Sequence, residues 1–120
     1  MSRADDELLD DIAAALTSIH SHLQHGPISI EIVLDAVAMR LLEIGEAVKS
    51  LSTGVTSTEP EIKWRDIAGM RDFLAHRYFA TSPEAVQAVI DKDLQPLAEA
   101  VARLRALLPP DDRDKTAPGG

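Results

Sequence analysis

The sequence predicts an all-α fold, an up-and-down bundle of four to five helices. Its 120 residues suffice for one domain with a modest core. Hydrophobic residues make up 45% of the chain and aromatics only 3%, so the apolar content is mostly Ala, Leu, Ile and Val, which suits helices better than sheets. Apolar residues also recur at helical spacing along most of the chain.

The first helix is expected to start from a cap at Ser2 and to end near Gly26-Pro27. Acidic residues follow the cap, where they favour the positive end of the helix dipole. The apolar face repeats at spacings of four, four, three and four, and consists of Leu8, Ile12, Leu16, Ile19 and Leu23.

The second helix has the most regular pattern of the chain. Its apolar seam alternates spacings of four and three, which predicts close packing against another helix, and consists of Ile30, Leu34, Val37, Leu41, Ile44, Val48 and Leu51. Further apolar or small residues lie outside the seam: Val33, Ala36, Leu42 and Gly45. A helix that is apolar on more than one side has more than one neighbour, which is either another helix of the chain or a second subunit.

The second half is expected to hold a polar loop at 52–62 and then two helices. One should begin near Lys63-Trp64 and fray around 78–81. The other has a start signal in Ser82-Pro83 and should run to about Leu108, with a kink near Lys92 because Pro96 lacks a backbone donor. We expect one helical domain over residues 1–108 and a flexible tail over 109–120.

Composition points to a soluble cytoplasmic protein without a membrane segment. There is no cysteine, no basic-then-apolar leader, and no apolar run near the roughly 20 residues that span a bilayer. The net charge of −8 disfavours a polyanionic partner, but its distribution is uneven. Residues 1–35 carry −6 and residues 83–120 carry −2, whereas residues 36–82 are neutral.

Polar groups are concentrated in the neutral part, in the segment Arg71-Asp72-Phe73-Leu74-Ala75-His76-Arg77-Tyr78. Asp72 and His76 are four residues apart and share a helix face, so Asp72 could orient the imidazole. Arg71 and His76 differ by about 140° on an ideal helix and would not reach one phosphate together. Three arrangements would allow it: the helix ends before His76, Arg71 reaches around it, or two protomers pool their residues. A solvated Arg71 and a His76 at a helix end would be the plainer interpretation.

This segment, RDFLAHRY, resembles the Arg-x4-His-x-Tyr signature of the HepT-like branch of the HEPN superfamily. Two more blocks resemble that family in the same order: LLEIGEAVK at 41–49 and WRDIAGM at 64–70. The resemblance extends over nearly the whole chain.

The resemblance implies a dimeric helical bundle with endoribonuclease activity, the toxin of a type II/VII-like toxin–antitoxin pair that needs no metal or other cofactor. A 2′-hydroxyl would attack the adjacent phosphorus and leave a 2′,3′-cyclic phosphate and a 5′-hydroxyl. His76 would transfer protons and Arg71 would clamp the phosphate, with Asp72 as the residue that orients His76.

Tyr78 has two interpretations. As a structural residue its ring would be half buried against Leu74. The resemblance implies instead that a minimal nucleotidyltransferase antitoxin transfers AMP from ATP onto Tyr78, which would block the cleft and repel RNA.

Two other groups are candidates. Glu43, Glu46 and Lys49 lie close to one stripe of the second helix, either as an exposed salt-bridged stripe or as part of a dimer cleft or antitoxin contact. His20, His22 and His25 could suggest zinc, but they are read as a solvated helix end.

A non-catalytic HEPN module that binds a nucleotidyltransferase partner or a nucleotide is the main alternative function. Intact Arg71, His76 and Tyr78 favour the ribonuclease, since a degenerate member would have lost one of them. A dimeric helical adaptor without a nucleotide ligand would leave the polar segment unexplained.

Overall fold

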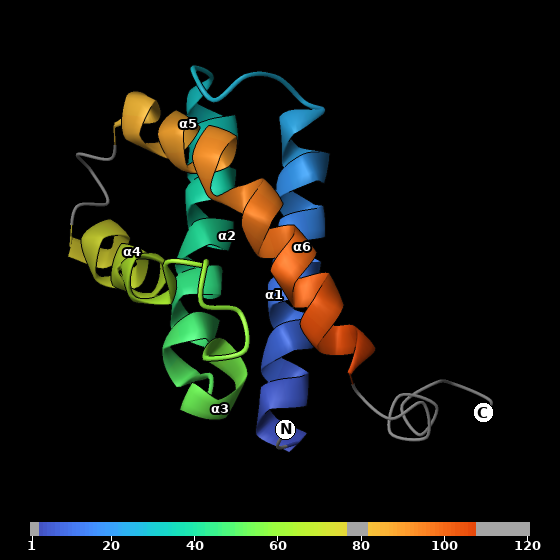
Figure 1. Cartoon of the computed structure of the whole chain (residues 1–120). Helices are drawn as coiled ribbons and strands as arrows, with labels where there is room; N and C mark the ends of the chain where they lie inside the picture. The colour runs from blue at the N-terminus through green and yellow to red at the C-terminus, as the bar shows by residue number, and fades with distance from the viewer. Residues whose placement is uncertain (1–2, 77–81, 108–120) are drawn as a thin grey trace.

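The computed structural model describes residues 3–76 and 82–107, and the side chains of residues 4–74 and 82–107. Within these ranges the regular secondary structure is all helical, without a strand (Figure 1). The helices are α1 (Arg3–Leu23), α2 (Glu31–Ser50), α3 (Thr53–Thr56), α4 (Trp64–His76), α5 (Pro83–Lys92) and α6 (Leu94–Ala106). The prediction of an all-helical bundle is confirmed.

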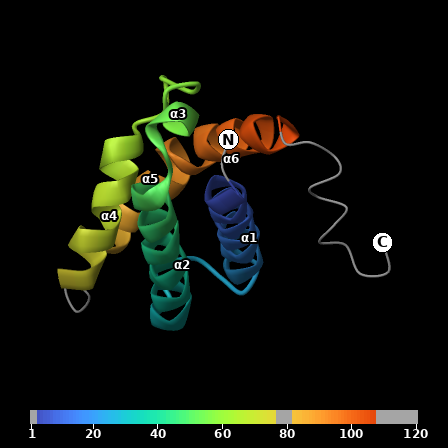
Figure 2. The same ribbon diagram turned by 90° about the horizontal axis from the view of Figure 1, so that it is seen from below.

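The helices form two layers. In Figure 2, α4, α2 and α1 lie in one row, and α5 and α6 pass across it on one side. The central helix of the row is α2, which packs against α1 on one flank and α4 on the other, while α6 packs against α1. We call the surface of the α1–α2–α4 row that is turned away from α5 and α6 the open face. The two-sided apolar pattern of α2 is therefore explained in part by two neighbours within the chain.

The core lies between the two layers and follows the predicted seams closely. Val37, Leu41, Ile44 and Val48 of α2 are buried, but Ile30, at the start of the seam, is 42% exposed. In α1 the most deeply buried side chains include Leu9, whereas Leu8 is only partly buried. The reason is that α1 contacts both α2 and α6, so its buried face is broader than one stripe.

The segment 52–62 differs from the predicted polar loop because it contains the one-turn helix α3, whose residue Val55 is buried. The start of this turn is held by Asp5 of α1, which is only 2% exposed. The Asp5 carboxylate accepts hydrogen bonds from the Ser52 backbone N–H at 2.9 Å and from the Ser52 hydroxyl at 2.8 Å. Asp5 therefore ties α1 to the corner after α2, in addition to lying in the first turn of its own helix.

The last predicted helix is present as two helices, α5 and α6, that meet at Asp93. The Ser82 hydroxyl accepts a hydrogen bond from the Ala85 N–H at 3.3 Å, and Pro83 is the first helical residue, so the predicted start is confirmed. The break next to Lys92 lies one helical turn before Pro96. Pro96 has no backbone N–H and cannot donate the hydrogen bond that would continue the helix there. Helix α6 ends at Ala106, two residues before the predicted end. The predicted cap Ser2 and the predicted tail 109–120 lie outside the described residues.

In the part of the chain that the structure describes, no helix is long and apolar enough to cross a bilayer.

Candidate functional site

The candidate site lies where α4 crosses α2, and Gly45 allows the two helices to approach closely there. Gly45 is buried, and a β-carbon at this position would stand 2.9 Å from the backbone nitrogen of Arg71 and 3.1 Å from the carbonyl oxygen of Ile67. Such distances are too short for a side chain of any size. The backbone of Arg71 is therefore set directly against α2.

The guanidinium of Arg71 is held by two carboxylates. Its Nε donates to Glu46 Oε2 at 2.7 Å, across the helix crossing, and its Nη1 donates to Asp72 Oδ1 at 2.9 Å. The hydrogen bond to Asp72, followed by that to Glu46, raises the pKa of Arg71 further above its already high ordinary value. Arg71 is therefore a permanent cation with a defined position.

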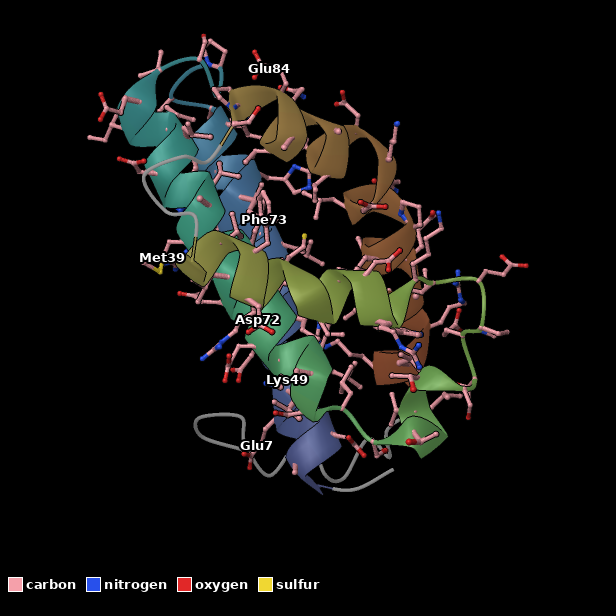
Figure 3. The ribbon with its side chains drawn as sticks, turned by 90° about the vertical axis from the view of Figure 1, so that its left-hand side faces the viewer. Glu7, Met39, Lys49, Asp72, Phe73 and Glu84 are labelled. Carbon is pink, nitrogen blue, oxygen red and sulfur yellow. The ribbon has the colours of Figure 1, made fainter. Side chains whose placement is uncertain are left out.

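The same guanidinium remains accessible. The Arg71 side chain is 38% exposed, on a surface with the more exposed Glu46 and Asp72. Figure 3 shows Asp72, Lys49 and Met39 in the part of the molecule away from α6, which is the open face. A phosphate could approach Arg71 there without moving the core.

His76 is the last residue of α4, and its side chain lies outside the described ones. The helix therefore does not end before His76, which excludes the first of the three arrangements considered above. The Arg71 side chain bonds to Glu46 of α2. This contact does not support the second arrangement, in which Arg71 reaches around α4. The role of Asp72 as the residue that orients His76 stays a prediction, and Tyr78 lies outside the described residues.

The two glutamates of the α2 stripe, Glu43 and Glu46, make different contacts. Glu43 pairs with Arg40 on the same helix at 2.9 Å, as an exposed salt-bridged stripe would. Glu46 instead reaches across to Arg71 on α4. Lys49 is exposed in the last turn of α2. The link between Glu46 and Arg71 was not predicted, although the segment that resembles the family motif contains both Gly45 and Glu46.

A groove of about 440 Å³ runs along the open face between α1 and α2 and reaches Glu46. Small residues such as Ala14, Ala47 and Ser50 line it, together with the charged Asp11 and Arg40. The groove places concave surface beside the candidate site.

The histidines of the α1 end do not form a metal site with neighbouring residues. His20 and His22 lie in the last turn of α1, and His25 follows it. In the part of the chain that the structure describes, no group of three or more His, Cys, Asp or Glu side chains could hold a metal ion.

The all-helical fold, with Arg71 and His76 on the same helix, agrees with the HEPN-type domain that the sequence motif implies. The family profile described as "Ribonuclease HepT-like" matches residues 12–104. The chain belongs to this ribonuclease family.

Individual relatives agree with the family. "Probable ribonuclease HepT" of Thermococcus cleftensis is 32% identical over 111 residues, which cover 88% of this chain and 99% of the relative. A "Putative RNase" of Caldanaerobacter subterraneus subsp. tengcongensis is 37% identical over 73 residues, which cover 60% of this chain and 65% of the relative. No solved structure matches the chain.

Proposed function

We propose that this chain is a metal-independent endoribonuclease that acts as the toxin of a cytoplasmic toxin–antitoxin pair. The observation that carries the proposal is the position of Arg71. Its guanidinium is fixed on the open face, is partly exposed, and belongs to the same helix as His76. Membership of the ribonuclease HepT-like family supports RNA as the substrate.

The proposed reaction is an internal transesterification of RNA. The 2′-hydroxyl loses its proton and attacks the adjacent phosphorus, while the 5′-oxygen of the next nucleotide leaves and takes up a proton. The products are a 2′,3′-cyclic phosphate and a 5′-hydroxyl. Imidazole, with an ordinary pKa of about 6.5, suits both proton transfers, and Arg71 stabilises the charge that builds on the non-bridging oxygens.

We propose that the active form is a homodimer, because Arg71 and His76 are five residues apart and diverge on an ideal helix, which disfavours joint contact with one phosphate within a protomer. Arg71 is held toward α2, about 140° around α4 from His76 on ideal geometry. Two protomers could bring Arg71 of one copy to His76 of the other and supply two imidazoles, one as base and one as acid. Large exposed apolar side chains on α2 and α4 are available for such an interface: Ile32 (76% exposed), in the first turn of α2, Met39 (44%) and Phe73 (47%).

Regulation is proposed at Tyr78, two residues after His76. A nucleotidyltransferase antitoxin would transfer AMP from ATP to the Tyr78 hydroxyl, with release of pyrophosphate. The added phosphate is an anion beside the catalytic His76, so it would repel RNA and fill the cleft.

The test of the proposed activity is cleavage of an RNA oligonucleotide in the presence of EDTA, with the product ends identified by mass spectrometry. We expect Arg71→Ala to slow cleavage by about 10²–10³-fold, as loss of one oxyanion-stabilising group does elsewhere, and His76→Ala to slow it at least as much. Arg65→Ala is the matched control, because it removes an exposed arginine from the same helix.

Parental rates in both site variants, or loss of cleavage on adding EDTA, would contradict the proposal. Binding of the nucleotidyltransferase without any RNA cleavage would instead identify the chain as a non-catalytic HEPN module.

A further inference from the structure

We infer that Glu46 is the positioning residue for Arg71, which rests on the proposed phosphate-binding role of Arg71. Glu46 is the residue of another helix that bonds to this guanidinium, with 2.7 Å between Arg71 Nε and Glu46 Oε2. Asp72 also bonds to it, but as the next residue on α4 it moves with Arg71. Glu46 therefore sets where the guanidinium lies relative to the rest of the fold.

The two neighbouring residues Gly45 and Glu46 act on Arg71 at two points. Gly45 admits the Arg71 backbone to the surface of α2, and Glu46 holds the far end of the same side chain. Arginine has several rotatable bonds and would otherwise lose much rotamer freedom when it binds a ligand. The contact with Glu46 removes part of that freedom before RNA arrives.

The bond to Nε leaves the outer edge of the guanidinium for a ligand. Of the five N–H donors of arginine, one on Nε serves Glu46 and one on Nη1 serves Asp72, which leaves three on Nη1 and Nη2 without a partner among the described residues. A phosphate can accept two parallel bonds from such an edge. Glu46 thus occupies the Nε donor, and the donors that remain for a ligand are on the two terminal nitrogens of a guanidinium that is 38% exposed.

The negative charge of Glu46 allows a role in positioning Arg71 to be distinguished from a role in attracting RNA. A carboxylate beside a phosphate site weakens RNA binding, so Glu46 cannot serve by drawing in the substrate. Its benefit must appear in the chemical step, where a misplaced group can cost up to about 10²-fold. Removal of Glu46 should therefore lower kcat without raising KM.

The experiment compares Glu46→Ala with Glu46→Gln in steady-state cleavage of an RNA oligonucleotide. The amide oxygen of Gln can still accept a bond from the Arg71 Nε–H, whereas Ala cannot. We expect Glu46→Ala to lower kcat about tenfold or more, Glu46→Gln to retain most of kcat, and KM to stay level or fall in both. Glu99→Gln, an exposed acid on α6, is the control for loss of one negative charge.

A second readout observes the bond directly and does not need activity. In a ¹⁵N spectrum of the full chain, we expect a slowly exchanging Arg71 Nε–H signal, assigned by its loss in Arg71→Lys. The signal should persist in Glu46→Gln and exchange rapidly in Glu46→Ala.

The positioning role is overturned if the parent cleaves RNA and Glu46→Ala keeps its kcat, or if the Nε–H signal is unchanged in Glu46→Ala. A parent that cleaves no RNA overturns the proposed function, and the positioning role falls with it. In that case the Nε–H signal still shows whether the bond forms.

Discussion

Gly45 of α2 faces the backbone of Arg71 of α4 so closely that a β-carbon on Gly45 would stand 2.9 Å from the Arg71 nitrogen. The contacted atoms belong to the backbone of a helix, so they cannot rotate away as the end of a flexible side chain could. The close approach of α2 and α4 therefore requires glycine at this position, and the position of Arg71 depends on it.

Gly45→Ala should destabilise the protein and reduce RNA cleavage. Alanine inside a helix normally gains about 0.5–1 kcal/mol over glycine, but overpacking against a fixed neighbour costs about 1–3 kcal/mol. We expect a net loss in the free energy of unfolding, measured by urea denaturation. The control is Gly69→Ala on α4, where a β-carbon meets no atom within 4 Å and should stabilise the helix. Equal stability of the two variants would contradict the steric explanation.

Ile32→Asp should convert the proposed dimer into monomers and abolish RNA cleavage. Ile32 is 76% exposed and lies in the first turn of α2, where an acidic residue is compatible with the helix dipole. The substitution should therefore leave the fold intact while it places a charge in an apolar interface. Light scattering coupled to size-exclusion chromatography measures the mass. Leu107→Asp, at another exposed apolar residue after α6, should leave the dimer unchanged. A dimeric Ile32→Asp protein would place the interface elsewhere.

Tyr78→Phe should cleave RNA like the parent but escape the antitoxin. Phenylalanine keeps the ring and removes the hydroxyl that would accept AMP. After incubation with the partner nucleotidyltransferase and ATP, peptide mass spectrometry should find added AMP on Tyr78 of the parent. The variant should stay unmodified and active under the same conditions. AMP at another residue, or none, would rule out the proposed switch.

Arg103→Gln should destabilise the protein at neutral pH and much less in acid. Arg103 Nη2 lies 2.6 Å from Glu59 Oε1, and this hydrogen bond lowers the pKa of Glu59 below its ordinary value of 4.5. A depressed carboxylate pKa adds stability above the unfolded pKa, and that contribution is lost as the pH falls through the folded value. The difference in Tm between parent and variant should therefore shrink as the pH falls below 4.5. A difference independent of pH would indicate lost packing rather than lost pairing.

Helical periodicity predicts most of this fold because it records which face of each segment is apolar. It correctly gives the start of α4 near Trp64 and most of the buried seam of α2, although Ile30 at the start of that seam is exposed. The missing donor of Pro96, and not periodicity, predicts a kink near Lys92, where the structure has a break between two helices. Periodicity does not predict α3, since one turn is too short to show a period. Nor does it predict the bond between Asp5 and Ser52, because a spacing of 47 residues carries no local signal.

For the candidate site, residue types and the family motif point to Arg71, Asp72 and His76 in one segment, and their catalytic roles stay predictions. Periodicity cannot show that Glu46 holds Arg71, because it does not say which helix lies beside which face. A glycine followed by an acid in the middle of an amphipathic helix was the available signal, since glycine there marks a close approach of backbones.

The adjacency of Gly45 and Glu46 also fixes the register of α4 on α2. A slide of α4 by one helical turn, about 5.4 Å, would move Arg71 away from both residues at once and press another part of α4 onto them. The close backbone contact at Gly45 and the hydrogen bond to Glu46 therefore favour the same register of α4 on α2.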